Sequence, residues 1–215
     1  MNGGCRETVN DKKMKIQPED QYKFMKLALP DGKAPDEHSV LLHACCAPCS
    51  AAIVECMLRN GIRPTVYFSN SNIYPQQEFE IRKHELMRYL EQQGVPYVED
   101  PYDHAQWLQT IHGLEGEPER GSRCSVCFQY RLSHAAAYAQ EQGFHWLTTT
   151  LASSRWKNIQ QIDMAGKTAV APYPDVEWWS QNWRKGGLQL RRSQLLKIND
   201  FYNQLYCGCE FSKND

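Results

Sequence analysis

The sequence predicts an α/β fold with a parallel sheet and a helical segment at its C-terminus. Short apolar runs alternate along the chain with longer amphipathic patterns, and this alternation is typical of βαβ units. The first run, residues 39–43 (SVLLH), is mostly apolar, as expected of a strand that a parallel sheet buries on both faces. Right-handed crossovers are expected to connect the strands.

Each predicted element follows from a local pattern. Strands are predicted at residues 39–43, 64–69, 95–98 and 145–149, and a fifth is predicted to begin at 170–171. Helices are predicted at residues 50–60, 76–93, 103–112, 126–142 and 188–206. Gly61 and Gly94 stop the first two helices, and Phe79, Leu86 and Leu90 form an apolar stripe on the second.

Length and composition suit one domain of ordinary size. Hydrophobic residues make up 41% of the 215-residue chain and charged residues 23%, which is normal for a globular protein. No apolar run approaches the roughly 18–20 residues that span a bilayer. Residues 1–20 are polar, without the apolar core of a secretory signal, and are expected to form a flexible lead-in to a metal-binding catalytic domain at 21–215. We therefore expect the protein to be cytoplasmic.

Basic residues gather near the C-terminus although the net charge is only −1. The segment 183–197 has no acidic residue and could attract phosphate groups. A solvated helix face explains the same pattern equally well. The basic side chains of this segment are Arg184, Lys185, Arg191, Arg192 and Lys197.

Nine cysteines in a chain without a secretory signal indicate metal binding or redox chemistry, because a reducing cytosol disfavours stable disulfides. Cys56 lies in a predicted helix and is interpreted as a buried structural residue, whereas Cys5 lies in the lead-in. The other seven form three clusters with short spacings, HACCAPCS, a C-x-x-C and a C-G-C: Cys45, Cys46, Cys49, Cys124, Cys127, Cys207 and Cys209.

Seven clustered thiols exceed what one structural zinc site uses, since such a site takes four ligands. The excess favours an iron–sulfur cluster together with a second metal or a reactive thiol pair. A zinc-stabilised RNA-binding module without catalysis remains an alternative. A nucleotide-dependent enzyme is disfavoured because the first strand is followed by HACCAPCS, which has no glycine to form a phosphate loop.

The motifs also fall where such folds bind ligands, beyond the carboxyl ends of strands. HACCAPC follows the first predicted strand, NSNIYP the second and TTTLASSRWKN the fourth. The position of a motif after a strand is independent of how its cysteines are spaced. The three positions therefore support one site that is shared by all three motifs.

Five strings resemble the QueH-type epoxyqueuosine reductases: LLHACCAPCS, FSNSNIYPQQEFEIRKHE, CSVCFQYRL, TTTLASSRWKN and LYCGCEFS. The similarity runs from about residue 40 to 212. One string departs from the family pattern, since residues 154–158 read SRWKN where S-P-x-K-N is expected. Lys157 and Asn158 are retained there.

The resemblance implies a fold of the HUP (adenine-nucleotide alpha-hydrolase-like) class and reduction of epoxyqueuosine to queuosine at the tRNA wobble position, the final step of queuosine biosynthesis. It also implies a 4Fe–4S cluster with an additional iron nearby and no cobalamin. The matching ligand positions are the seven clustered cysteines. Another iron–sulfur tRNA-modifying activity is kept as an alternative. An external donor such as a flavodoxin or ferredoxin would have to supply electrons.

The candidate catalytic residues are His43, Cys45, Cys46 and Cys49. His43 could serve as an acid, although a histidine packed at a strand end is the simpler interpretation. An i, i+4 ion pair is likewise the simpler interpretation of Glu78 and Arg82. The aromatic residues of 173–183 could stack on bases or belong to the core. The candidate tRNA-binding residues are Tyr74, Glu78, Arg82, Lys157, Asn158, Arg184, Arg191 and Arg192.

Overall fold

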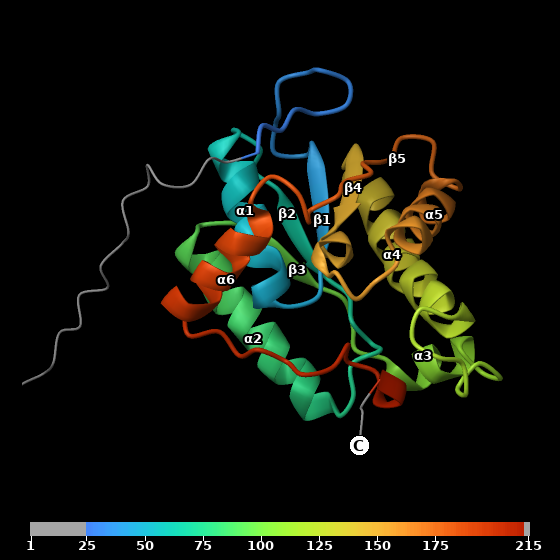
Figure 1. Cartoon of the computed structure of the whole chain (residues 1–215). Coiled ribbons are helices and arrows are strands. Elements are labelled where there is room, and N and C mark those ends of the chain that lie inside the picture. Colours follow the sequence, from blue (N-terminus) through green and yellow to red (C-terminus); the bar gives the residue numbers. More distant parts are fainter. Residues whose placement is uncertain (1–24, 213–215) are drawn as a thin grey trace, which may run out of the picture.

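A five-stranded parallel sheet forms the centre of the computed structural model, which describes residues 25–212 (Figure 1). The strand order is β3-β2-β1-β4-β5. The chain builds outward from β1 to β3 and then returns to pair β4 with the other side of β1, so the switch point lies between β1 and β4. The predicted α/β class is confirmed. The strands are β1 (Val40–Ala44), β2 (Thr65–Phe68), β3 (Tyr97–Glu99), β4 (Trp146–Thr149) and β5 (Glu177–Trp178).

Helices cover both faces of the sheet (Figure 1). One face carries α1 (Ala47–Arg59), α2 (Gln76–Gln92) and α6 (Leu188–Ile198), and the other carries α4 (Ser122–Gln142) and α5 (Ile159–Val170). The short α3 (His104–Thr110) packs beside the 3-10 turn η3 (Glu210–Ser212), and a second turn, η2 (Thr150–Ser153), continues directly from β4. Within residues 25–212, no helix combines the length and apolar character that a membrane crossing requires.

Alternation along β1 divides the core between the two faces. Val40, Leu42 and Ala44 pack with α1 and α2, whereas Leu41 packs with the alanine-rich α4. Both faces are buried, which explains why the run is almost continuously apolar. Close packing explains the glycine at position 166 of α5, because a Cβ there would lie 2.2 Å from the ring of Trp178.

Four predicted strands match the structure to within two residues, but the fifth is wrong. Residues 170–171 end α5, and the fifth strand is Glu177–Trp178. The prediction failed because α5 was overlooked. Its N-terminal boundary is set by Asn158, whose side chain accepts from the backbone N–H groups of Gln160 and Gln161. The predicted lead-in at 1–20 lies outside the described residues.

Three helix boundaries differ in ways that matter for the cysteines. Helix α1 begins at Ala47 and α4 at Ser122, so Cys49 and both residues of the C-x-x-C are helical. Helix α6 ends at Ile198, eight residues before the predicted end, because Asn199 caps it and Asp200 has a positive φ of 49°. The C-G-C is therefore delivered by an irregular segment rather than by a helix.

Candidate metal centre

Three cysteines form a compact triad at the carboxyl end of β1. Cys45 and Cys46 lie between β1 and α1, and Cys49 lies in the first turn of α1. Their Sγ atoms all lie within 4.8 Å of one another, with 3.8 Å between those of Cys45 and Cys46. Thr150, at the start of η2, places its Oγ1 3.7 Å from the Cys45 Sγ. We call Cys45, Cys46 and Cys49 the thiol triad.

The triad supports one thiolate but not three. Hydrogen bonds from Cys46 and Cys49 hold the pKa of Cys45 well below its usual value. The same contacts raise the pKa of Cys46 well above its usual value, and interaction with Cys45 raises that of Cys49 to about 11. Like charges this close cannot all form unless a cation neutralises them. A metal ion or cluster would replace the two remaining thiol protons.

Four more cysteines form a second thiol group across α4 and the C-terminus. Cys124 and Cys127 lie in the first turns of α4, and Cys127 packs with Cys209 and Trp107. Cys207 interacts electrostatically with Cys124, Cys127 and Cys209. Burial raises the pKa of Cys127 to about 12, so it too is a neutral thiol without a metal. All eight cysteines in residues 25–212 are free thiols rather than disulfides.

Lys157 links the two sets of thiols. Burial opposes the charged form of its ammonium group, but electrostatic interaction with Cys207, Cys45 and Cys49 outweighs burial and holds the pKa of Lys157 above its usual value. The Lys157 side chain is therefore close enough to thiols of both sets to interact with them electrostatically. Folding has therefore brought cysteines from the beginning, middle and end of the chain to one edge of the sheet.

A C-terminal segment, residues 199–209, runs from α6 to η3 (red in Figure 1) and contacts the triad; we call it the strap. The Nε2 of Gln204 donates to the Cys46 Sγ at 2.8 Å. Arg82 is buried in α2 and donates to the carbonyl oxygens of Cys207 (3.0 Å) and Tyr206 (3.4 Å). Its charge is balanced by Glu78 at 2.7 Å. The i, i+4 ion pair expected from the sequence is present and holds the strap.

His43 lies beneath the triad and is fully enclosed. Its Nδ1 lies 2.7 Å from the Thr149 Oγ1, and its Nε2 lies 3.1 Å from the Ser69 carbonyl oxygen. Because a carbonyl only accepts, Nε2 carries the proton and Nδ1 accepts from the hydroxyl. Burial and the nearby Arg131 lower the pKa of His43 to about 3. The geometry favours the packed, neutral histidine over a proton donor, and the catalytic role stays a prediction.

The other candidate tRNA-binding residues mostly have structural partners. Asn158 caps α5, and Arg184 donates to the Lys157 carbonyl oxygen at 2.6 Å. Arg191 binds the carboxylate of Glu55 through two nitrogens, at 2.7 and 2.8 Å. Tyr74 is exposed at the triad's edge of the sheet, where its N–H donates to the Gly208 carbonyl. Arg192 is half-buried on α6. Their roles toward substrate stay predictions.

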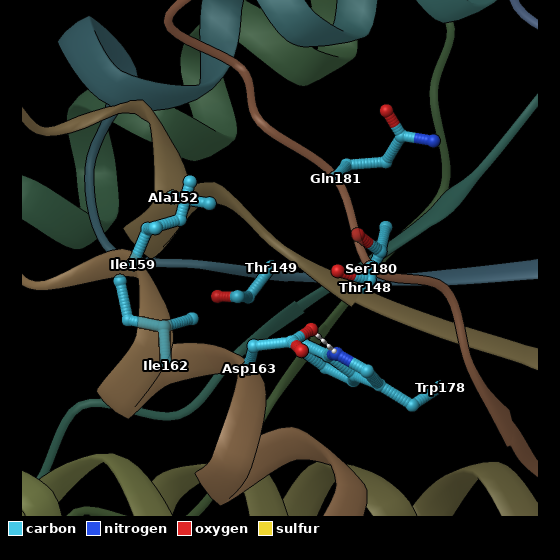
Figure 2. A pocket seen from close by; sticks show the side chains of 9 residues that line it. All are labelled: Thr148, Thr149, Ala152, Ile159, Ile162, Asp163, Trp178, Ser180 and Gln181. Carbon is cyan, nitrogen blue, oxygen red and sulfur yellow. Dashed lines mark hydrogen bonds between the residues drawn. The ribbon is translucent and has the colours of Figure 1, made fainter.

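A small pocket lies beyond the carboxyl end of β4, on the α5 side (Figure 2). Its volume is about 10 Å³, which leaves room for a single water molecule. Within it, the Trp178 Nε1 donates to the Asp163 carboxylate at 2.7 Å. The pocket is too small for a nucleotide.

The donor set fits a metal or iron–sulfur group. Thiolates are soft ligands, and the triad offers three within one coordination sphere while the second thiol group lies across Lys157. Gln204, Thr150 and Arg131 are neighbours of the thiols that were not predicted from the sequence. Thr150 could have been found because it directly follows a predicted strand, but the strap that carries Gln204 was predicted to be helical.

Comparison with known proteins identifies the chain's relatives. The family model for epoxyqueuosine reductase QueH matches residues 40–215. Proteins named epoxyqueuosine reductase QueH from Acinetobacter baylyi and Histophilus somni are 43% and 45% identical, covering 89% and 88% of this chain and 86% and 76% of their own. A protein of the same name from Thermotoga maritima is 31% identical over 81% of this chain and 90% of its own. The chain belongs to the QueH family of epoxyqueuosine reductases, which are oxidoreductases.

Proposed function

We propose that this protein reduces epoxyqueuosine to queuosine at the wobble position of tRNA. The step cleaves both C–O bonds of the epoxide and forms a carbon–carbon double bond. It consumes two electrons and two protons and releases the oxygen as water. The family match, the thiol triad and the electrostatic interaction of Lys157 with thiols of both sets support this activity.

We infer that four of the seven thiolates hold a 4Fe–4S cluster and that up to three hold an additional iron. The group would supply electrons singly, after recharging by an external donor such as a flavodoxin or ferredoxin. Two separate sets of thiols support two metal components, since one four-ligand site would leave three cysteines without a role. The proposed reaction does not use cobalamin.

Lys157 is proposed to stabilise the negative charge that develops on the epoxide oxygen. It is a half-buried cation beside both sets of thiols, and a fixed charge in a site of low dielectric costs little reorganisation when negative charge appears. The strap limits solvent on the other side of the triad, because Cys46 is buried beneath Gln204.

The decisive experiment is anaerobic purification or reconstitution followed by reaction with tRNA that carries epoxyqueuosine. We expect brown protein with iron–sulfur absorption, and nucleoside mass spectrometry should show conversion to queuosine when reductant is supplied. Colourless protein with stoichiometric zinc and no conversion would instead support the zinc-stabilised RNA-binding alternative. Brown protein that converts another modified nucleoside would support the alternative iron–sulfur activity.

A further inference from the structure

One tryptophan stands apart from the other five. Trp156 is 63% exposed, whereas Trp107, Trp146, Trp179 and Trp183 are buried and Trp178 is half-buried against Asp163. All six lie within the described residues. Exposing an indole ring costs the burial that normally stabilises such a large apolar surface, so an exposed one beside a reactive centre calls for a partner.

The tryptophan sits at the corner of a tight turn that ends at Lys157. The Lys157 N–H donates to the Ser154 carbonyl at 3.2 Å, which closes a four-residue turn and puts Arg155 and Trp156 at its tip. Lys157 interacts with thiols of both sets. The exposed ring is therefore one residue from the cation that we place beside the substrate epoxide.

The turn is fixed to the metal centre by Arg120. Its Nε donates to the Trp156 carbonyl oxygen at 2.7 Å, and its backbone N–H donates to the Cys124 Sγ at 3.2 Å. Gln161 of α5 donates to the Arg120 carbonyl at 2.7 Å. Arg120 adopts a positive φ of 67°, an unfavourable conformation that these three contacts hold in place.

Positive charge surrounds the ring. The guanidinium of Arg155 lies 4.8 Å from the ring centre of Trp156 and covers one face. Arg120 is exposed next to it, and Arg184 binds the Lys157 carbonyl oxygen from the other side. Glu119 is the neighbouring carboxylate, next to Arg120 in the chain. Basic groups around an aromatic ring match a nucleic acid strand, whose phosphates carry charge and whose bases stack.

We propose that Trp156 is the stacking platform for a base of the anticodon loop, with Arg155 and Arg120 contacting the adjoining phosphates. The proposal rests on the proposed function, since it identifies which surface presents the wobble nucleoside to the metal centre. Trp156 takes the base-stacking role that the sequence suggested for the aromatic residues of 173–183. Trp178, Trp179 and Trp183 contribute to the core instead. The proposal also assigns the phosphate contacts to Arg155 and Arg120 instead of Arg191, which binds Glu55.

Binding measurements test the platform without requiring turnover. Iron-loaded wild-type protein, Trp156→Ala and Trp156→Phe are titrated with a fluorescently labelled RNA hairpin carrying the anticodon stem and loop. Losing one stacked base corresponds to about 5- to 150-fold weaker binding for Trp156→Ala, and Trp156→Phe should recover most of it. Met164→Ala, which trims a side chain that is 67% exposed on α5, is the matched control and should bind like wild type.

Two further binding measurements test the proposal. A blunt RNA duplex should bind wild type and Trp156→Ala equally, because its bases are not available for stacking. Arg155→Gln should lower the slope of log Kd against log salt by about 0.7. Iron content and absorption should match wild type in each variant, since the ring is exposed.

Wild-type hairpin affinity in Trp156→Ala would overturn the proposal, as would equal weakening for hairpin and duplex. If Trp156→Ala instead raised only the KM for a reduced acidic electron-donor protein, the turn would be a donor-docking surface and the proposal would be wrong. Failure of the wild-type enzyme to convert epoxyqueuosine contradicts the proposed function, whereas the hairpin titrations decide on Trp156 by themselves.

Discussion

At the scale of single residues, Lys157 connects the sequence motif to the chemistry. Its ammonium group interacts with Cys45, Cys49 and Cys207, which come from two different sets of thiols. A cation in this place has two possible roles, to stabilise the thiolates that bind metal or to stabilise charge on the substrate. Removing the charge should lower the iron content if Lys157 stabilises the metal-binding thiolates, and should lower kcat if it stabilises charge on the substrate.

We expect Lys157→Met to lower kcat about 100-fold while iron content stays at the wild-type level. Removing one preorganised charge at a developing oxyanion typically costs about 10²- to 10³-fold. Lys157→Arg keeps the charge and should retain part of the activity. Iron analysis and single-turnover kinetics on epoxyqueuosine tRNA measure both quantities. Loss of iron in Lys157→Met would assign the residue to metal retention instead.

A polar network around Asp100 and His134 gives the free energy of unfolding a defined pH dependence. Asp100 accepts from Tyr67 at 2.8 Å and Ser69 at 2.6 Å, and its Oδ2 lies 2.8 Å from the Nδ1 of His134. The hydrogen bond to Asp100 raises the pKa of His134 above 6.5. The charged histidine therefore stabilises the folded state fully below about pH 6.5, and this contribution is lost as pH rises through the raised pKa.

The expected result is a larger stability difference between wild type and His134→Gln at pH 6 than at pH 9. Anaerobic urea unfolding at the two pH values measures it. In an Asp100→Asn background, the same histidine substitution should show a difference that does not change with pH, since the partner charge is absent. A pH-independent difference in the wild-type background would contradict the assignment of this pair.

At the scale of elements, four of the five strands could be predicted, whereas the fifth strand and the strap could not. The run at 39–43 is apolar because β1 is buried on both faces, and that signal is local. The strap has no periodic pattern of its own. Its path depends on Arg82, which lies more than 100 residues away and donates to the carbonyls of Tyr206 and Cys207. Contacts between residues so far apart in the chain cannot be predicted from local sequence patterns.

Arg82 has a structural role because it holds the strap. Mutation can distinguish this role from substrate binding. Arg82→Met leaves Glu78 buried without its partner, and breaking a buried pair typically costs about 3–5 kcal/mol. We therefore expect a lower melting temperature and reduced iron content, because the strap carries Cys207 and Cys209. Thermal unfolding under anaerobic conditions and iron analysis check this outcome.

Arg88 on the same helix is the matched control. It is largely exposed and donates to the Asn199 carbonyl at 3.3 Å, where the strap begins. Surface contacts of this type contribute little, so Arg88→Met should keep stability and iron close to wild type. Wild-type stability and iron in Arg82→Met, with only a raised KM for tRNA, would restore the substrate-binding role predicted from the sequence.

At the scale of the whole molecule, parallel topology explains how the motifs meet. The thiol triad follows β1, and Lys157 follows β4 and η2, so the switch point between these adjacent strands puts both at one edge. This part of the site was predictable from strand order. Strand order does not predict that the other four cysteines come together, because no sheet connection joins α4 to the C-terminus. Only the metal-binding chemistry of thiols led us to expect it. These cysteines are Cys124, Cys127, Cys207 and Cys209.

The convergence predicts that distant cysteines share one metal centre. Cys209→Ser should lose iron and absorption although it lies more than 150 residues from the triad, and Cys45→Ser should lose them as well. Cys56→Ser is the matched control, since Cys56 is equally a buried thiol but lies on α1 facing Met25, outside both sets. It should retain iron and turnover. Iron and sulfide analysis of anaerobically reconstituted variants measures each case. If most variants of the seven clustered cysteines kept full iron, the thiols would be neighbours without a common metal, and the redox activity would need another source of electrons.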